Sequence, residues 1–409
     1  MLELQKVLVT VIGPDTPGIT AAMSGVLAEN HARLLDIEQV VVQGQLTLCM
    51  LIGVSPATAV GEPVIKDLLF RAKSMGLDLQ FKIIDQRVGA LPAATTEGHL
   101  RYAVTAIGDS LDAEGVHILT RELAALGANI ESIRKLSGPH LISLEVIVSL
   151  PGGDCRAAEL RRALMQGLEP TNIDVGVQRE RLTRRAKRLI VMDMDSTLIQ
   201  IEVIDELARM HGVVDRVGDI TRRAMAGELD FAASLTERVG LLKGLPYARA
   251  LELATRLPLT QGAPELLKVL QRLGYKTAVI SGGFSFAANV LKEELGLDYA
   301  FSNELEVVDG LLTGRVVGAI VTPERKAELL REIAEREGIA LDQTIAIGDG
   351  ANDLGMLTAA GLGIAFHAKP KLKAAADTAV SAGGLDRMLY LLGLPWRDVE
   401  ELLAETPEG

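Results

Sequence analysis

The amino-acid sequence predicts an α/β protein: a doubly wound parallel sheet with an inserted helical cap, preceded by two small α+β modules. Residues 7–13 are echoed by residues 102–108, and this internal repeat predicts two similar modules. From residue 189 onward, short apolar runs alternate with long helical stretches, which is typical of buried parallel strands. A chain of 409 residues has room for two or three domains of about 150 residues each.

Both copies of the repeat predict the element order βαββαβ. The expected elements after each first strand are helices at residues 19–29 and 116–126 and strands at residues 34–42, 46–54, 130–136 and 141–150. A ferredoxin-like module of four antiparallel strands with two helices on one face satisfies this order in about 70 to 80 residues. We therefore expect domains at residues 1–88 and 99–178, joined by a small, polar linker.

Residues 179–409 are expected to form the third domain. Its predicted parallel strands are residues 189–192, 277–280, 344–347 and 362–366. About 80 residues separate the first two strands, far more than one crossover needs, so we expect a helical cap at about residues 201–260. Ligands of such sheets bind beyond the carboxyl ends of the strands, so chemistry is expected just after these runs.

Composition and charge restrict the partners that the protein can have. A formal charge of −12 disfavours nucleic acid and anionic membrane as partners. Two distant cysteines, no signal peptide pattern and no apolar run of about 18 residues favour a reducing cytoplasm. Residues 179–188 include six basic side chains but no aromatic platform, so we favour a solvated connector over a nucleic-acid site.

Carboxylates follow two of the predicted strands. Asp193 and Asp195 come directly after the first strand, where two close negative charges repel unless a cation or a shared proton intervenes. Asp349, Asn352 and Asp353 follow a later strand and offer oxygen ligands of the kind that Mg²⁺ prefers. Together these residues predict a divalent metal site.

Two further segments are candidates for binding phosphate. Ser281 and Gly282 end the second strand, where backbone N–H groups and a hydroxyl can cradle an anion, although a plain tight turn is an equal alternative. Lys326 lies near a predicted helix start, a position at which most lysines are simply solvated.

The four segments at Asp193, Ser281, Lys326 and Asp349, taken in their order along the chain, resemble the haloacid dehalogenase phosphatase superfamily. The resemblance covers roughly residues 188–390. Cap residues fall where members that act on phosphoserine carry their substrate-selecting side chains: Glu202, Met225, Phe231 and Arg238. The resemblance implies hydrolysis of O-phospho-L-serine to L-serine and phosphate, the last step of serine biosynthesis. One alternative is that the substrate is another phospho-amino acid or a phosphoprotein. The other is an amino-acid-sensing protein with a relic phosphatase domain.

The resemblance also implies roles for the acidic residues. Asp193, ionised at neutral pH, attacks phosphorus and forms an aspartyl phosphate, while Asp195 moves protons for both half-reactions. Mg²⁺ is held by Asp193, Asp349 and the backbone carbonyl of Asp195, with Asp353 supporting the metal shell and Asn352 orienting ligand oxygens.

The cap residues are expected to recognise the amino-acid part of the substrate. Glu202 supplies the negative charge for an ammonium group, and Arg238 can hold a carboxylate with two parallel hydrogen bonds. Met225 and Phe231 shield the site from water, with plain packing of the cap as an equal alternative.

The amino-terminal half resembles the ACT domain, an amino-acid-sensing module that mycobacterial-type relatives carry in tandem. The resemblance lies in the βαββαβ order and in the loop from Gly13 to Gly18, where Asp15 is available to an ammonium group. It implies that L-serine binds at Gly13, Asp15 and Gly18 at a contact between subunits of a homodimer and lowers activity. The second copy lacks both prolines of this loop, so ligand binding there is an open question.

Overall fold

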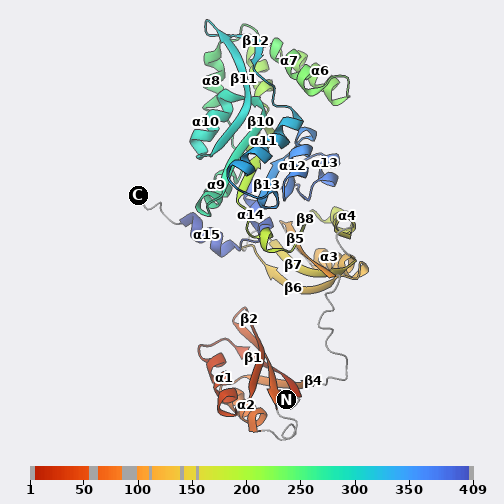
Figure 1. Cartoon of the computed structure of the whole chain (residues 1–409), viewed down its shortest axis with the longest axis vertical. Coiled ribbons are helices and arrows are strands. Elements are labelled where there is room, and N and C mark those ends of the chain that lie inside the picture. The colour runs from red at the N-terminus through yellow and green to blue at the C-terminus, as the bar shows by residue number, and fades with distance from the viewer. Residues whose placement is uncertain are drawn as a thin grey trace. The chain divides into compact units, whose positions relative to one another are not determined.

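The computed structural model describes residues 5–54, 63–84, 99–109, 113–138, 142–152 and 156–404. The chain divides into two compact units, Met1–Thr96 and Glu97–Gly409, which are described separately (Figure 1). Among the described residues, no helix combines the length and the apolar character that a membrane crossing requires.

The first unit has the predicted βαββαβ order. Its elements are β1 (Gln5–Pro14), α1 (Ile19–Glu29), β2 (Arg33–Val42), β3 (Gln45–Val54), α2 (Pro63–Ser74) and β4 (Asp78–Ile84). The strands form an antiparallel sheet in the order β2-β3-β1-β4. Alternate residues of β1, among them Val9 and Val11, are buried in a core that includes Met23 of α1 and Leu68 of α2. Every residue of the edge strand β2 is exposed.

The second unit opens with the second copy of the repeat. Its elements are β5 (His99–Gly108), α3 (Ala113–Ala125), β6 (Asn129–Lys135), β7 (Ile142–Pro151), α4 (Arg156–Leu168) and β8 (Asp174–Arg179). The strand order β8-β5-β7-β6 reproduces that of the first copy. The prediction of two ferredoxin-like modules is therefore confirmed.

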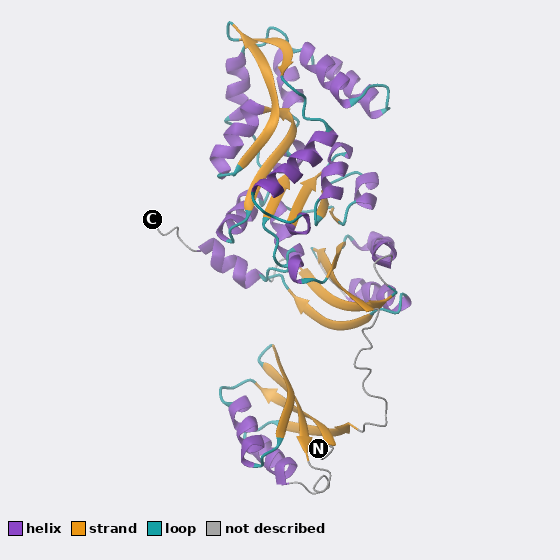
Figure 2. Cartoon of the chain, viewed as in Figure 1, coloured by secondary structure: helices purple, strands orange, loops and turns teal. Residues whose placement is uncertain are grey.

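A mainly parallel sheet follows. Its strands are β9 (Leu189–Met192), β10 (Lys276–Phe284), β11 (Tyr299–Val308), β12 (Leu311–Val317), β13 (Thr344–Gly348), β14 (Gly363–Phe366) and β15 (Thr378–Val380). These strands lie side by side in the order β12-β11-β10-β9-β13-β14-β15. Each pair of neighbours from β11 to β15 in this order is parallel, and the edge strand β12 is antiparallel to β11. In β9, Ile190 and Met192 pack into one apolar cluster and Leu189 and Val191 into another. Both faces of the sheet are covered by helices, as the doubly wound prediction requires (Figure 2).

The first four α-helices after β9 form the cap, and further helices cover the sheet. The cap helices are α5 (Val203–His211), α6 (Val214–Met225), α7 (Phe231–Gly240) and α8 (Tyr247–Ala254). The other helices are α9 (Ala263–Arg272), α10 (Ser285–Leu295), α11 (Pro323–Arg336), α12 (Leu354–Ala359), α13 (Pro370–Ala375), α14 (Met388–Leu391) and α15 (Trp396–Ala404). The helical cap is where the sequence predicts it.

The sheet of the second module continues into the parallel sheet. Strand β15 pairs with β8 in antiparallel fashion through Thr378 and Gly176, so that eleven strands form one sheet. The side chain of Gln178 donates to the carbonyl of Leu391 at 2.7 Å across this junction. The exact domain boundaries that we expect from the sequence stay predictions.

The expectation that residues 179–188 form a solvated connector is wrong for two of the basic side chains, whereas Arg181, Arg185 and Arg188 are exposed. Arg184 and Lys187, from the middle of the basic run, are 3% and 5% exposed and lie at the junction. Arg184 pairs with the buried Glu145 of β7 at 2.7 Å, and Lys187 donates to the backbone carbonyl of Asp342 at 2.5 Å. The sequence pattern missed this burial because the acidic partner is 39 positions away along the chain.

Candidate active site

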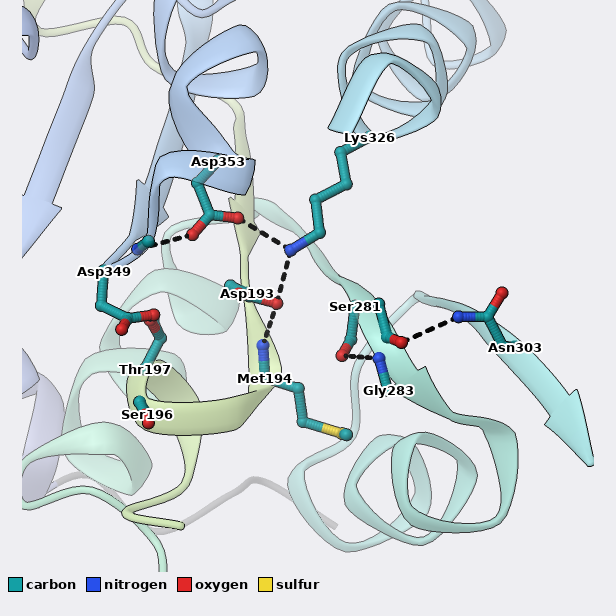
Figure 3. A network of polar contacts seen from close by, with 12 residues as sticks. Asp193, Met194, Ser196, Thr197, Ser281, Gly283, Asn303, Lys326, Asp349 and Asp353 are labelled. Carbon is teal, nitrogen blue, oxygen red and sulfur yellow. Dashed lines mark hydrogen bonds and ion pairs between the residues drawn. The ribbon is translucent and has the colours of Figure 1, made fainter. Parts of the chain in front are cut away.

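Asp193 directly follows β9 and is almost fully buried at the carboxyl edge of the sheet (Figure 3). Its Oδ1 accepts a hydrogen bond from the backbone N–H of Met194 at 2.8 Å. The chain then makes a tight turn in which Ser196 takes a left-handed conformation, with a φ of +57°. The next helix, α5, begins at Val203, and the backbone N–H of Val203 donates to the Asp195 side chain. Asp195 thus lies near the same edge as Asp193.

Lys326 is fully buried and joins two of the carboxylates. It lies in the first turn of α11, whose start is fixed by Pro323 and by the Thr322 hydroxyl, which accepts from the backbone N–H of Arg325. Its ammonium nitrogen lies 2.7 Å from Asp193 Oδ1 and 2.7 Å from Asp353 Oδ1. Burial lowers the pKa of Lys326, but the two negative charges outweigh it, so the net pKa is raised and the lysine stays charged.

The carboxylates of Asp193, Asp349 and Asp353 form a compact group of oxygen ligands. One oxygen from each lies within 4.8 Å of the others. Burial and the negative charges of Asp193 and Glu202 raise the pKa of Asp349 to about 6. Burial also raises the pKa of Asp353. Such electrostatic crowding fits a site for a hard divalent cation, because bound positive charge removes the penalty that the empty group carries.

Asp195 lies apart from this group of three. Its Oδ1 accepts from the backbone N–H of Val203 at 3.1 Å, while its Oδ2 lies beside Gly283. Burial, followed by the charges of Glu202 and Asp193, raises the pKa of Asp195 well above its ordinary value. In this structure the group therefore favours the protonated form, which suits a proton donor.

The irregular carboxyl end of β10, which we call the Ser281 loop, places Ser281, Gly282 and Gly283 beside Asp195. The backbone N–H of Gly283 donates to Ser281 Oγ at 2.8 Å, so this N–H is already bonded rather than free as we expected for an anion cradle. A Cβ on Gly283 would lie 2.6 Å from Asp195 Oδ2, which explains why glycine is needed there. The loop is thus shaped around the Asp195 carboxylate.

Asn303 of β11 holds this loop, and the sequence pattern did not single it out. The side chain is 1% exposed. Its Nδ2 donates to the carbonyl of Gly282 at 2.8 Å, and its Oδ1 accepts from the backbone N–H of Val321 at 2.8 Å. Asn303 therefore ties the Ser281 loop to the segment that leads into α11 and Lys326. Only the tertiary pairing of β10 with β11 reveals this role.

Two charged cap residues face the carboxylates. Glu202 precedes α5, and its Oε1 accepts from the Ser196 hydroxyl at 2.8 Å. Although much of Glu202 is exposed, loss of hydration and the nearby charges of Asp193 and Asp205 raise the pKa of its carboxyl group. Arg238 of α7 is half-buried, and its burial lowers its pKa against the opposing attraction of Glu202. The structure thus brings both predicted cap charges to the site.

The two apolar cap residues differ in position. Phe231, at the start of α7, packs on the Ser281 loop: a Cβ on Gly282 would lie 2.6 Å from its Cζ atom. Met225, at the end of α6, is 69% exposed, and its sulfur lies 3.8 Å from Lys369 Nζ. Phe231 is therefore placed to shield the site in this structure, whereas Met225 lies at the surface.

The remaining predicted residues lie in two places. Asn352 is half-buried in the loop between β13 and α12, next to Gly350. Gly13, Asp15 and Gly18 belong to the first unit and surround the start of α1. There Gly18 has a φ of +95°, and the backbone N–H of Asp15 donates to the carbonyl of Gly44 at 2.8 Å.

Comparisons with known families agree with the fold and the site. Residues 187–361 match the haloacid dehalogenase-like hydrolases, and residues 5–82 and 101–178 each match an ACT domain. The solved structure of a HAD family hydrolase from Salmonella enterica covers 71% of this chain and 98% of its own, with a TM-score of 0.62 and 33% identity. Fold and site together define a haloacid dehalogenase-like hydrolase with two ACT domains.

Full-length relatives narrow the class. Phosphoserine phosphatase SerB2 of Mycobacterium tuberculosis is 43% identical over 395 residues, which are 97% of this chain and 95% of that protein. A phosphoserine phosphatase of Streptomyces coelicolor is 42% identical over 398 residues, 97% of this chain and 94% of that protein. The structure of a probable phosphoserine phosphatase from Vibrio cholerae has a TM-score of 0.56 and 37% identity, covering 73% of this chain and 88% of its own. The chain belongs to the phosphoserine phosphatase family.

Proposed function

We propose that the protein hydrolyses O-phospho-L-serine to L-serine and phosphate through an aspartyl phosphate on Asp193, with Mg²⁺ as its cofactor. One observation supports this proposal above the others: the buried ammonium group of Lys326 lies 2.7 Å from both Asp193 and Asp353, at the edge of the sheet where the cap charges converge. The relatives named above carry the same activity in their names.

The three carboxylates suit the proposed metal. Asp193 and Asp349 offer hard oxygen ligands at a site crowded with negative charge, the backbone carbonyl of Asp195 is the third protein ligand that we propose, and Asp353 supports the metal shell. When bound, Mg²⁺ neutralises charge on the phosphoryl oxygens and helps to position them. Lys326 supplies a fixed positive charge for the same oxygens.

The chemistry needs one nucleophile and one proton carrier. Asp193 Oδ1 is engaged by Met194 and Lys326, which leaves Oδ2 to attack phosphorus as the bond from phosphorus to the serine oxygen breaks. Asp195, with its raised pKa, gives its proton to the departing serine oxygen. The resulting carboxylate then takes a proton from the water that attacks phosphorus, and phosphate leaves while Asp193 is regenerated.

Substrate choice is proposed to depend on Glu202 and Arg238, which present opposite charges to the ammonium and carboxylate groups of phosphoserine. Glu202→Gln and Arg238→Ala should each lower kcat/KM for phosphoserine at least tenfold, because each removes a charge-assisted contact worth roughly 1.5–3 kcal/mol. Rates on a phosphomonoester without an amino acid, such as p-nitrophenyl phosphate, should change by less than about threefold.

Exposed cap residues provide matched controls for this test. Glu228→Gln and Arg256→Ala remove the same charges from side chains that are 60% and 74% exposed. Both should retain wild-type kcat/KM. If Glu202→Gln and Arg238→Ala lose activity equally on both substrates, these residues support the cap rather than recognise serine, and the substrate assignment is wrong.

Regulation by L-serine and a homodimer complete the proposal. The edge strand β2 exposes apolar side chains, among them Val40 at 56% and Val42 at 63%, as a strand that pairs with a second copy would. Val40→Asp/Val42→Asp should convert a dimer into a monomer in light scattering, whereas Leu182→Asp, at a residue that is 96% exposed, should not. A wild-type chain that is monomeric at micromolar concentration would contradict the dimer.

L-serine is proposed to bind at Gly13, Asp15 and Gly18, where the start of α1 presents backbone N–H groups and Asp15 is exposed. Titration calorimetry on the full chain should detect L-serine, and Asp15→Ala should weaken its binding. Inhibition by L-serine that survives Asp15→Ala unchanged would place the regulatory site elsewhere.

A further inference from the structure

A polar cavity lies at the junction between the second ACT module and the phosphatase core. It has a volume of about 230 Å³ and shares no lining residue with the carboxylate site. Tyr102 and Arg161 line it from the module, and Asp342 and Asp377 line it from the core. The two buried cations of the basic run, Arg184 and Lys187, also line it.

The cavity has an excess of positive side chains. Five cationic residues line it, against the two carboxylates of Asp342 and Asp377; the five are Arg161, Arg179, Arg181, Arg184 and Lys187. Arg161 pairs with Asp377 at 2.7 Å, and Arg184 pairs with Glu145 at 2.7 Å and with Glu180 at 2.5 Å. Among the described residues, neither Arg181 nor Lys187 forms an ion pair with a carboxylate, so these two cations of the lining can face a ligand.

Two buried cations lack full compensation in the described part of the chain. The Arg184 side chain is 1% exposed, yet its Nη1 atom has no hydrogen-bond partner there. The Lys187 ammonium donates to a backbone carbonyl rather than to a carboxylate. Burial, only partly opposed by Asp342 and Asp377, lowers the pKa of Lys187 to about 8. An anion in the cavity would give Lys187 the negative partner that it lacks.

We propose that this cavity binds a small oxyanion of the size of phosphate. Guanidinium groups match the tetrahedral oxyanion geometry with paired hydrogen bonds, and a cavity of about 230 Å³ has room for an ion of this size. The ligand would contact both the ACT module and Gly361, which follows α12, the helix that begins directly after Asp353. The site thus links the regulatory module to the metal loop and goes beyond the proposed catalytic function.

Two exposed arginines of the basic run allow a matched test. Arg181 lines the cavity, whereas Arg188 does not, and both residues are exposed, so neither substitution threatens the fold. Inorganic phosphate is titrated into the full chain by calorimetry in EDTA, which weakens binding at the catalytic site. Arg181→Ala should weaken phosphate binding at the junction cavity at least tenfold, and Arg188→Ala should leave this binding unchanged. Lys187→Met, checked for a cooperative melting transition, should abolish it.

The outcomes separate the junction from other sites. Equal phosphate affinity in wild type, Arg181→Ala and Lys187→Met would overturn the proposal, because all binding would then belong to the catalytic site. Equal weakening by Arg181→Ala and Arg188→Ala would also overturn it, since only general surface charge would matter. L-serine is titrated in parallel: a loss confined to L-serine in Arg181→Ala would show that the cavity takes an amino acid and not a phosphate-sized oxyanion.

Discussion

At the scale of single residues, the site is a balance between crowded carboxylates and one buried lysine. Asp193, Asp195, Asp349 and Asp353 repel one another, and Lys326 compensates only part of this charge. Raised pKa values of this kind mean that the ionised carboxylates destabilise the fold unless a positive charge is bound. Function therefore costs stability here, and the charge that would restore it is that of the cation.

The raised pKa of Asp349, about 6, gives a prediction about pH. The unfolded carboxyl group titrates near 3.8, so the metal-free protein should lose stability as pH rises from about 4 to 6 and carry the full penalty above that range. At pH 7 in EDTA, Asp349→Asn should raise the free energy of unfolding by on the order of 2 kcal/mol. It should also lower kcat by at least about a hundredfold.

Denaturant titrations at pH 4 and pH 7 check this prediction. The stabilisation by Asp349→Asn should be largely lost near pH 4, because the carboxyl group is then protonated in the folded state and about half protonated in the unfolded state. Asp219→Asn, at a side chain that is 63% exposed, should change stability by less than about 0.5 kcal/mol at either pH. A destabilised Asp349→Asn protein at pH 7 without metal would contradict the electrostatic explanation.

Asn303 provides a second test at this scale, because it ties the Ser281 loop to the segment before Lys326. Asn303→Ala should lower kcat about tenfold or more and destabilise the protein by about 1–3 kcal/mol, since buried partners lose their hydrogen bonds. Asn303→Asp keeps the acceptor for Val321 but loses the donor to Gly282, so it should lower kcat as well.

A purely structural role for Asn303 would give a different result. In that case both variants would melt earlier but retain wild-type kcat per folded molecule. Asn289→Ala, at an exposed asparagine of α10, is the control that should change neither quantity.

At the scale of elements, apolar runs were sufficient to place the strands that carry the site. Strand β9 is Leu189–Met192 as predicted, and β13 differs from its prediction by one residue, because both are fully buried and, apart from Thr344, apolar. The hairpin of β11 and β12 and the short β15 were not predicted. Strand β12 alternates between exposed and more buried residues, and β15 has only 3 residues, so neither gives a continuous apolar signal.

The Ser281 loop, at the carboxyl end of β10, gives a prediction at this scale. Gly283→Ala would place a Cβ 2.6 Å from Asp195 Oδ2 and 3.1 Å from Ser281 Oγ. Because the Asp195 side chain can move, the fold should survive, but the displaced carboxylate should lower kcat about a hundredfold. Steady-state assays together with thermal melting check both effects.

Gly218 of α6 is the matched control, because a Cβ there meets no atom within 4 Å. Gly218→Ala should keep full activity and stabilise the cap by about 0.5–1 kcal/mol, since alanine favours a helix. Wild-type kcat in Gly283→Ala would show that the loop does not fix Asp195.

At the scale of the whole molecule, the chain forms two compact units, and the second unit contains both the second ACT module and the phosphatase core. Periodicity reveals each module separately, whereas the pairing of β8 with β15 joins segments about 200 residues apart and has no local signature. The buried Arg184 was missed for the same reason, because six clustered basic residues resemble a solvated run until their distant partners are known. The candidate catalytic residues were found because their strands are consecutive in the sheet.

The division into units predicts the result of truncation. Residues 97–409 should fold with a melting temperature close to that of the full chain, because this unit keeps its complete eleven-stranded sheet. Residues 179–409 should be insoluble or melt many degrees lower, because β15 loses its partner strand and Arg184 loses Glu145. A fragment 179–409 as stable as 97–409 would show that the second module is merely attached.

The most direct test concerns the covalent step at Asp193. The full chain is mixed with phosphoserine labelled with ³²P in the presence of Mg²⁺, quenched in acid within milliseconds, digested and mapped. The label should be found on the peptide that contains Asp193, and Asp193→Asn should carry none. Label on another peptide, or no protein-bound label at any time during a turnover that releases phosphate, would contradict the proposed mechanism.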